Sequence, residues 1–138
     1  MNIHKMDAFE FVLPTKVVFG VGSVKKTAEE LKVFGGKHPL IVTDRGIEKA
    51  GIVKKVTDVL DEAGIPYDVF NGVEANPKDV NVEEGARAAR ACGSDCLLAV
   101  GGGSPIDCAK AIGVLLAHNA EFISHTRARP QRRFRIRF

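Results

Sequence analysis

The stretch LLAVGGGSPIDCAKAIGVLLA, residues 97–117, decides the fold because a strand pattern, a glycine turn and a helix pattern follow one another without a break. The apolar run at residues 97–100 is typical of a short strand that is covered on both faces. Gly101, Gly102 and Gly103 come next, and their missing Cβ atoms allow positive φ angles and let a ligand lie directly against backbone amides. The stretch therefore predicts a strand–turn–helix unit that can approach a ligand closely.

The helix start that follows the glycines has the features of an anion site. Ser104 suits the N-cap, Pro105 suits the first helical position, and Asp107 at the third position completes a capping box. The unpaired amides and the positive dipole end of such a helix favour a phosphate group. The alternative is an ordinary strand-to-helix turn in which Asp107 is only a cap.

Strand and helix patterns alternate along the rest of the chain. The predicted strands are residues 40–42, 65–70 and 96–100, and the predicted helices run from 23 to 34, from 52 toward Gly64, from 80 toward Gly93, and from 105 to 118. Two β-rich runs, residues 9–13 and 15–19, flank Pro14 and predict an N-terminal β-hairpin. This order predicts an α/β fold with a Rossmann-like, doubly wound parallel sheet.

The composition is that of one globular domain. The chain has 138 residues, of which 45% are hydrophobic and 27% charged. No apolar run approaches the roughly 20 residues that a membrane span requires. The N-terminus also has no apolar signal core. We therefore expect a cytoplasmic protein without a membrane partner.

No metal-ligand pattern is visible in the sequence. Cys92 and Cys96 have a C-x₃-C spacing with no second pair to complete a zinc site. Cys108 falls in the first turn of the glycine-capped helix, but a buried free thiol is the expected state of all the cysteines. The four histidines show no i, i+4 pair. We predict neither a catalytic residue nor a metal ligand in this chain.

An abrupt change of composition separates residues 1–123 from residues 124–138. The second segment, SHTRARPQRRFRIRF, holds six arginines and no acidic residue, so the net charge of +3 belongs to this tail. We expect a folded domain at 1–123, followed by a disordered tail or a frameshift product. The alternative is that the tail binds nucleic acid or another anion on contact, although a nucleic-acid partner is not favoured.

A family resemblance rests on several motifs in one order. GGGSPIDCAK resembles the GGGSxxDxAK signature of the iron-containing (group III) alcohol dehydrogenases. The resemblance continues through GVEANPKDVNVEEGARAARACGSD and VTDRGIEKAGIVKKVTDVLDEAGI to FVLPTKVVFGVGS, and it covers roughly residues 9–123. It implies the N-terminal nucleotide-binding domain of an enzyme that transfers hydride between an alcohol and NAD.

The resemblance also implies what the rest of such an enzyme would contain. In the family, one aspartate and three histidines on a following helical domain hold iron or zinc. This sequence contains no counterpart of that C-terminal domain. We therefore expect a truncated form that is inactive alone, and whether the chain is itself an enzyme stays open.

Asp44 and Asn76 follow two of the predicted strands. A carboxylate at Asp44 can accept hydrogen bonds from ribose hydroxyls and repel a 2′-phosphate, which favours NAD over NADP as the cofactor. Its alternative role is a helix cap. Asn76 lies in an ANP turn, where its amide can bond a ligand or simply initiate the turn. The resemblance places both residues at the cofactor cleft.

The predicted cofactor-binding set is therefore Asp44, Asn76, Gly101, Gly102, Gly103, Ser104 and Asp107. The expected partners are a dinucleotide and further copies of this chain, because a half-covered domain with a sheet edge tends to self-associate. A non-catalytic, self-assembling module is the rival function.

Overall fold

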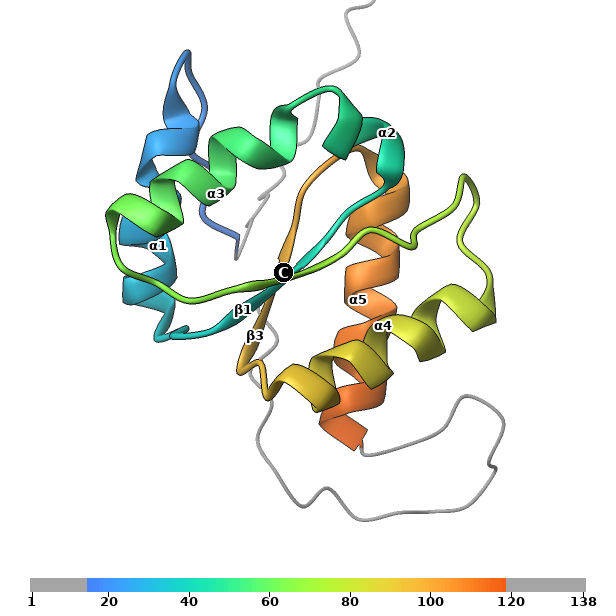
Figure 1. The fold of residues 1–138 in the computed structure, drawn as a ribbon. Helices are drawn as coiled ribbons and strands as arrows, with labels where there is room; N and C mark the ends of the chain where they lie inside the picture. Colours follow the sequence, from blue (N-terminus) through green and yellow to red (C-terminus); the bar gives the residue numbers. More distant parts are fainter. Residues whose placement is uncertain (1–14, 119–138) are drawn as a thin grey trace, which may run out of the picture.

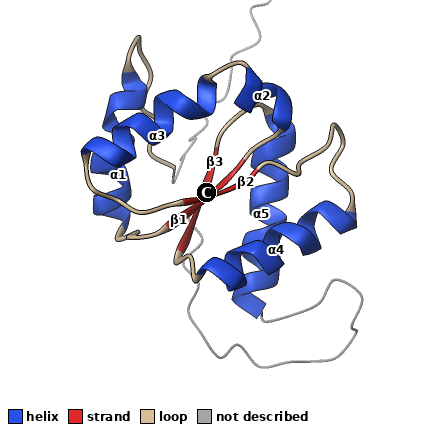
Figure 2. Cartoon of the chain, viewed as in Figure 1, coloured by secondary structure: helices blue, strands red, loops and turns tan. Residues whose placement is uncertain are grey.

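The computed structural model describes residues 15–118, which form short helices around a small sheet (Figures 1 and 2). In chain order the elements are η1 (Ser23–Lys26), α1 (Thr27–Phe34), β1 (Pro39–Val42), α2 (Arg45–Lys49), α3 (Ile52–Glu62), β2 (Asp68–Phe70), α4 (Asp79–Cys92), β3 (Cys96–Ala99) and α5 (Gly103–His118). The arginine-rich tail and the first arm of the predicted hairpin lie outside the described residues. No helix of the described part is long and apolar enough to cross a membrane.

The sheet is parallel and has the strand order β2-β1-β3. Leu40 of β1 lies opposite Asp68 on one side and Leu97 on the other. All four residues of β1 are buried, as expected for a central strand covered on both faces. The predicted parallel α/β sheet is confirmed.

Helices cover both faces of the sheet (Figure 1). Alternate residues of β1 divide the core, because successive side chains of a strand point to opposite faces. Leu40 and Val42 pack with apolar residues of α4 and α5. Ile41 packs with apolar residues of α1 and α3 on the other face. This arrangement is the doubly wound, Rossmann-like layout that the sequence predicts.

Glycines end two of the helices as the sequence indicates. Gly35 after α1 and Gly93 after α4 adopt left-handed φ angles of 86° and 69°. In each case the glycine N–H donates to carbonyls of the last helical turn. These carbonyls would otherwise lack a hydrogen-bond partner at the end of the helix.

Two predicted strands differ from the structure. Residues 15–19 form no strand, so the described half of the predicted hairpin is wrong. β2 begins at Asp68 rather than at residue 65. Ile65 still closes the end of α3 by donating its N–H to the Leu60 carbonyl, and Pro66 has no N–H to offer a sheet. The strand can therefore begin only after them.

Candidate nucleotide-binding site

The carboxyl ends of β1 and β3 lie side by side where the chain reverses its winding. From β1 the chain passes through α3 on one face to β2, and from β2 it returns through α4 on the other face to β3. The chain thus leaves β1 toward α3 on one face, whereas it leaves β3 toward α5 on the other face, and the two paths diverge between β1 and β3. Such a topological switch point is where open α/β sheets bind ligands.

Hydrogen bonds hold the two strand ends together at this edge. The Val100 N–H donates to the Val42 carbonyl at 2.9 Å. The hydroxyl of Thr43, which is fully buried, donates to the Val100 carbonyl at 2.8 Å. The segments that leave β1 and β3 therefore start from fixed positions.

Asp44 leaves β1 in extended conformation and caps α2. Its Oδ1 accepts a hydrogen bond from the Ile47 N–H at 2.9 Å. The cap, which the sequence left as an alternative role, is thus present in the structure. Among residues 15–118 no other donor bonds to the Asp44 side chain, so Oδ2 keeps its full capacity to accept hydrogen bonds.

The glycine turn after β3 contains one glycine that the fold requires. Gly101 has a φ of 142°, and a Cβ there would lie 2.8 Å from Pro105 Cγ and 3.3 Å from Ile47 Cγ1. A Cβ on Gly102 or Gly103 would meet no atom within 4 Å. These two glycines are therefore not needed for packing, and their backbone lies open to a ligand.

The predicted capping box at α5 is wrong. The helix begins at Gly103, so Ser104 lies within its first turn instead of before it. The Ile106 N–H donates to the Gly102 carbonyl at 3.4 Å, which makes glycine backbone the start of the helix. Pro105 fits there because the first turn needs no N–H from it. Asp107 is exposed and its carboxylate lies 3.9 Å from Lys110 Nζ.

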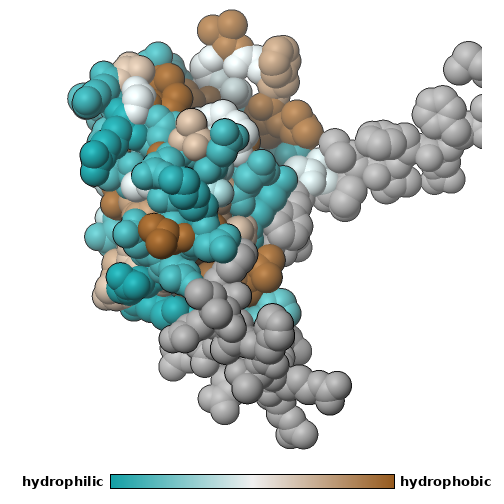
Figure 3. Space-filling view, turned by 90° about the vertical axis from the view of Figure 1, so that its right-hand side faces the viewer, coloured by the Kyte–Doolittle hydropathy of each residue, from teal (hydrophilic) through white to brown (hydrophobic). Residues whose placement is uncertain are grey.

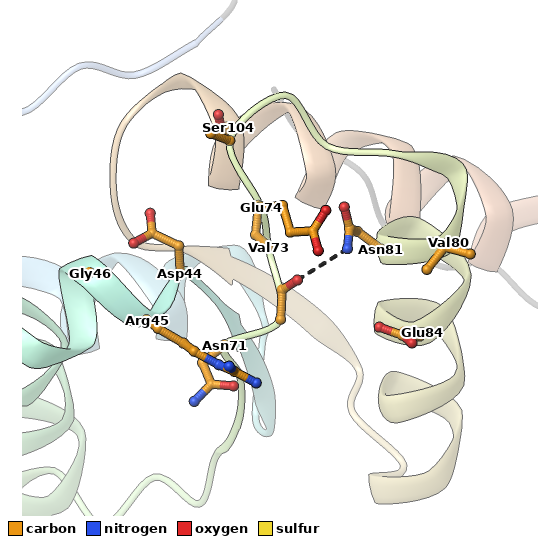
Figure 4. A pocket seen from close by; sticks show the side chains of 12 residues that line it. Asp44, Arg45, Gly46, Asn71, Val73, Glu74, Val80, Asn81, Glu84 and Ser104 are labelled. Carbon is orange, nitrogen blue, oxygen red and sulfur yellow. Dashed lines mark hydrogen bonds between the residues drawn. The ribbon is translucent and has the colours of Figure 1, made fainter.

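A cleft of about 550 Å³ opens at this edge of the sheet (Figure 4). Its walls come from the start of α2, the loop after β2, the first turns of α4 and Ser104 of α5. The lining residues are Asp44, Arg45, Gly46, Asn71, Gly72, Val73, Glu74, Ala75, Val80, Asn81, Glu84 and Ser104.

Only Asp44 and Ser104 of the predicted set line this cleft. The three glycines are exposed beside it, next to Ser104 in the chain. Asn76 is also exposed, with a left-handed φ of 57°.

Sequence reasoning missed the asparagines that shape the cleft. Asn81 is 3% exposed, donates to the Gly72 carbonyl at 3.2 Å and accepts from the Lys78 N–H at 2.9 Å. It therefore holds the loop after β2 against α4. Asn71 donates to Glu48 at 2.7 Å and ties the end of β2 to α2. The available signal for Asn81 was a polar residue between two valines at the start of a predicted helix.

The charges of the cleft are mainly negative. Asp44, Glu74 and Glu84 contribute carboxylates, and Arg45 contributes the one guanidinium of the lining. Such a lining disfavours a phosphate and suits a group that donates hydrogen bonds. The phosphate-binding features lie instead at the exposed glycine backbone and the start of α5.

Two chemical groups bear on catalysis here, the Cys108 thiol and the possible metal ligands among the described residues. Burial raises the pKa of the Cys108 thiol to about 11, which keeps it protonated. Among residues 15–118, His38, Asp68 and Cys92 form the one group of three possible metal ligands, and they lie at the opposite edge of the sheet. The described residues therefore do not fit a set of one aspartate and three histidines.

Comparisons with known proteins agree with the fold. A family model described as iron-containing alcohol dehydrogenase matches residues 14–136. The 1,3-propanediol dehydrogenase of Citrobacter freundii is 42% identical over 119 residues, which are 85% of this chain and 31% of that protein. Choline dehydrogenase of Bacillus subtilis strain 168 is 41% identical over 129 residues, 93% of this chain and 32% of that protein.

A solved structure shows the same architecture. The NADH-dependent butanol dehydrogenase A of Thermotoga maritima superposes with a TM-score of 0.76 at 36% identity, covering 84% of this chain and 29% of that one. The chain spans about 30% of the length of the relatives that it matches. Because the family model covers most of the sequence, the chain belongs to the iron-containing alcohol dehydrogenase family.

Proposed function

We propose that residues 15–118 form the part of an NAD-dependent alcohol dehydrogenase that binds the adenine dinucleotide. The observation that carries this proposal is the open backbone of Gly102 and Gly103, which stands at the start of α5 beside a topological switch point. The pyrophosphate would accept hydrogen bonds from the amides of Gly102, Gly103 and Ser104 and would face the positive end of the α5 dipole. Bound NAD supplies the acceptor for the hydride that leaves the alcohol carbon.

The side chains of the cleft support NAD over NADP. Asp44 has one carboxylate oxygen engaged with α2 and a second that can accept hydrogen bonds from ribose hydroxyls. A 2′-phosphate there would lie against the carboxylates of Asp44, Glu74 and Glu84, with Arg45 as the opposing charge. The repulsion from three carboxylates exceeds the attraction of one guanidinium, so the adenosine of NAD fits better.

The substrate class that we infer is an alcohol. The names of the relatives refer to propanediol, choline and butanol, so they share the reacting hydroxyl group but little else. We expect the 138-residue polypeptide alone not to oxidise these alcohols, because its described residues contain no set of one aspartate and three histidines to hold the family's metal. Following NADH formation with and without added iron or zinc checks this expectation.

Calorimetric titration with NAD and with ADP-ribose tests the binding proposal. We expect both to bind weakly and with similar affinity, because the proposed contacts are all to the ADP-ribose half. Gly102→Ala should lower both affinities about tenfold or more, since a methyl group would occupy the space proposed for the pyrophosphate. Its thermal unfolding should match that of the original chain, because the added Cβ meets no atom within 4 Å.

Gly101→Ala is the contrasting variant. Its Cβ would lie 2.8 Å from Pro105 in a backbone conformation that favours glycine, so it should lower the unfolding temperature. If Gly102→Ala binds NAD as well as the original chain does, the pyrophosphate is not at this turn and the proposal fails.

A further inference from the structure

Three side chains of different chemistry meet at the edge of the sheet opposite the cleft. His38 immediately precedes β1, Asp68 is the first residue of β2, and Cys92 is the last residue of α4. Because parallel strands begin at the same edge, residues 30 and 24 positions apart in the sequence come together there. The site is separate from the cleft, whose walls lie at the carboxyl ends of the strands.

The donor atoms of this His-Asp-Cys cluster are close enough to share one ion. His38 Nε2 lies 2.8 Å from Asp68 Oδ2, and these two atoms and Cys92 Sγ all lie within 4.8 Å of one another. Around a tetrahedral zinc ion, ligand bonds of about 2.0 to 2.3 Å place neighbouring donor atoms roughly 3.3 to 3.8 Å apart. Small side-chain rotations would thus convert the present spacing into a coordination shell.

Access and charge also suit an ion. The side chains of His38 and Asp68 are 30% and 50% exposed, and Cys92 is half-buried, so an ion can enter from solvent. Among the described residues, the Cys92 thiol makes one hydrogen bond, a donation from Sγ to the Ala89 carbonyl at 3.6 Å. A carboxylate and a thiolate together carry two negative charges, which balance a divalent cation.

The backbone around the cluster is fixed by contacts that leave its donor atoms available. Asp95 accepts hydrogen bonds from the N–H groups of Lys37 and His38 at 2.9 to 3.1 Å, and its own N–H donates to the His38 carbonyl at 3.1 Å. These hydrogen bonds anchor the segment that carries His38.

The other two residues are equally well held. Asp68 is fixed by its pairing with Leu40 across the sheet. Cys92 precedes Gly93, whose N–H closes the end of α4. Because the three side chains stand on or next to regular elements, little backbone movement is needed for them to bind an ion together, which favours tight binding.

We propose that His38, Asp68 and Cys92 bind one divalent cation of the zinc class, with water as the fourth ligand. One nitrogen, one oxygen and one sulfur donor form a set that selects borderline-soft ions such as Zn²⁺ over Mg²⁺ and Ca²⁺, which prefer oxygen ligands. The ion would connect the starts of β1 and β2 with the end of α4. It would stabilise the fold, because the unfolded chain does not hold the three ligands together.

Metal titration of the whole 138-residue chain, with its thiols kept reduced, tests this site. Co²⁺ should bind at one equivalent and give a thiolate-to-cobalt charge-transfer band together with the intense visible bands of four-coordinate cobalt. Zn²⁺ should displace Co²⁺ and raise the unfolding temperature, whereas Mg²⁺ should leave it unchanged. Six-coordinate cobalt spectra without a charge-transfer band would overturn the proposal.

Variants identify the ligands. Cys92→Ser should abolish the charge-transfer band, and Asp68→Asn should weaken Zn²⁺ binding about tenfold or more while keeping the shape of an exposed side chain. His118→Gln is the matched control, since this exposed imidazole contacts the Val114 carbonyl far along α5 and should leave binding unchanged. A band that persists in Cys92→Ser, or binding that is lost in His4→Gln or His125→Gln instead, contradicts the assignment. Because the cluster and the cleft lie at opposite edges of the sheet, the metal titrations and the NAD titrations test the two sites separately.

Discussion

Asp44 illustrates how one side chain can serve the fold and the ligand together. Its Oδ1 caps α2, and the same carboxylate lines the cleft (Figure 4). The cap needs only an oxygen acceptor, whereas discrimination against a 2′-phosphate needs a negative charge. The two roles can therefore be separated by substitution.

Asp44→Asn should keep the cap and remove the charge. We expect the affinity for NADP to rise toward that for NAD, with unfolding unchanged, because asparagine caps a helix as well as aspartate does. Asp44→Ala removes both properties and should also lower the unfolding free energy by about 1 kcal/mol. Calorimetry with both dinucleotides and thermal unfolding measure the two effects. If Asp44→Asn still prefers NAD as strongly as before, the selectivity comes from another residue.

Single residues were predictable where their role depends on local sequence. Asp44 follows a recognisable strand, so both of its roles could be stated in advance. Ser104 was misplaced because glycine backbone starts α5 without help from a side chain. His38, Asp68 and Cys92 could not be found together, since the register of β1 and β2 and the packing of α4 are both needed to bring them within 4.8 Å. Asn81 was missed because its partners lie in a loop whose path the sequence does not specify.

At the scale of elements, α4 and α5 approach closely on one face of the sheet (Figure 2). Gly85 of α4 makes this possible. A Cβ there would lie 2.3 Å from Ile112 Cδ1 and 3.1 Å from Phe70 Cε1, and Ile112 is fully buried. The helix pair therefore depends on a missing side chain, since a well-packed core has little room for an added atom.

Gly85→Ala should lower the unfolding free energy by about 1 to 3 kcal/mol, even though alanine favours a helix more than glycine does. Ile112→Val removes the Cδ1 atom of the 2.3 Å clash but keeps a carbon at the 3.0 Å position of Cγ1, so in the double variant it should lower the cost of the alanine without abolishing it. Chemical denaturation of the four proteins of this cycle measures the coupling. If Gly85→Ala lowers the unfolding free energy equally with isoleucine and with valine at position 112, the Ile112 side chain is not what the added methyl group clashes with.

The elements were predictable where periodicity and glycine agree. The alternation of strands and helices, and the ends of α1 and α4, follow from apolar spacing and from Gly35 and Gly93. The prediction of a strand at residues 15–19 failed, because a β-rich composition does not guarantee a neighbouring strand to pair with. The close packing at Gly85 could not be predicted from sequence patterns either, since it depends on how α4 and α5 cross.

On the scale of the whole molecule, apolar side chains gather ahead of η1. Val17, Val18, Phe19 and Val21 are exposed, and Phe19 is 99% exposed. Figure 3 shows hydrophobic side chains at the top of the molecule, where the N-terminal part of the described chain lies in Figure 1. A protein surface rarely leaves such a group uncovered, so this apolar segment is a candidate contact between copies of the chain.

We expect the chain to form a dimer or a larger oligomer through this apolar segment. Phe19→Ser combined with Val21→Ser should shift the mass measured by light scattering toward the monomer while the circular dichroism spectrum stays that of a folded chain, because both side chains are exposed. Deletion of residues 124–138 should leave the number of chains per particle unchanged at low and high salt, since apolar contacts do not depend on the arginines. A monomer after the deletion alone would assign the contact to the tail. If the original chain is itself a monomer at micromolar concentration, its exposed valines and Phe19 do not drive association.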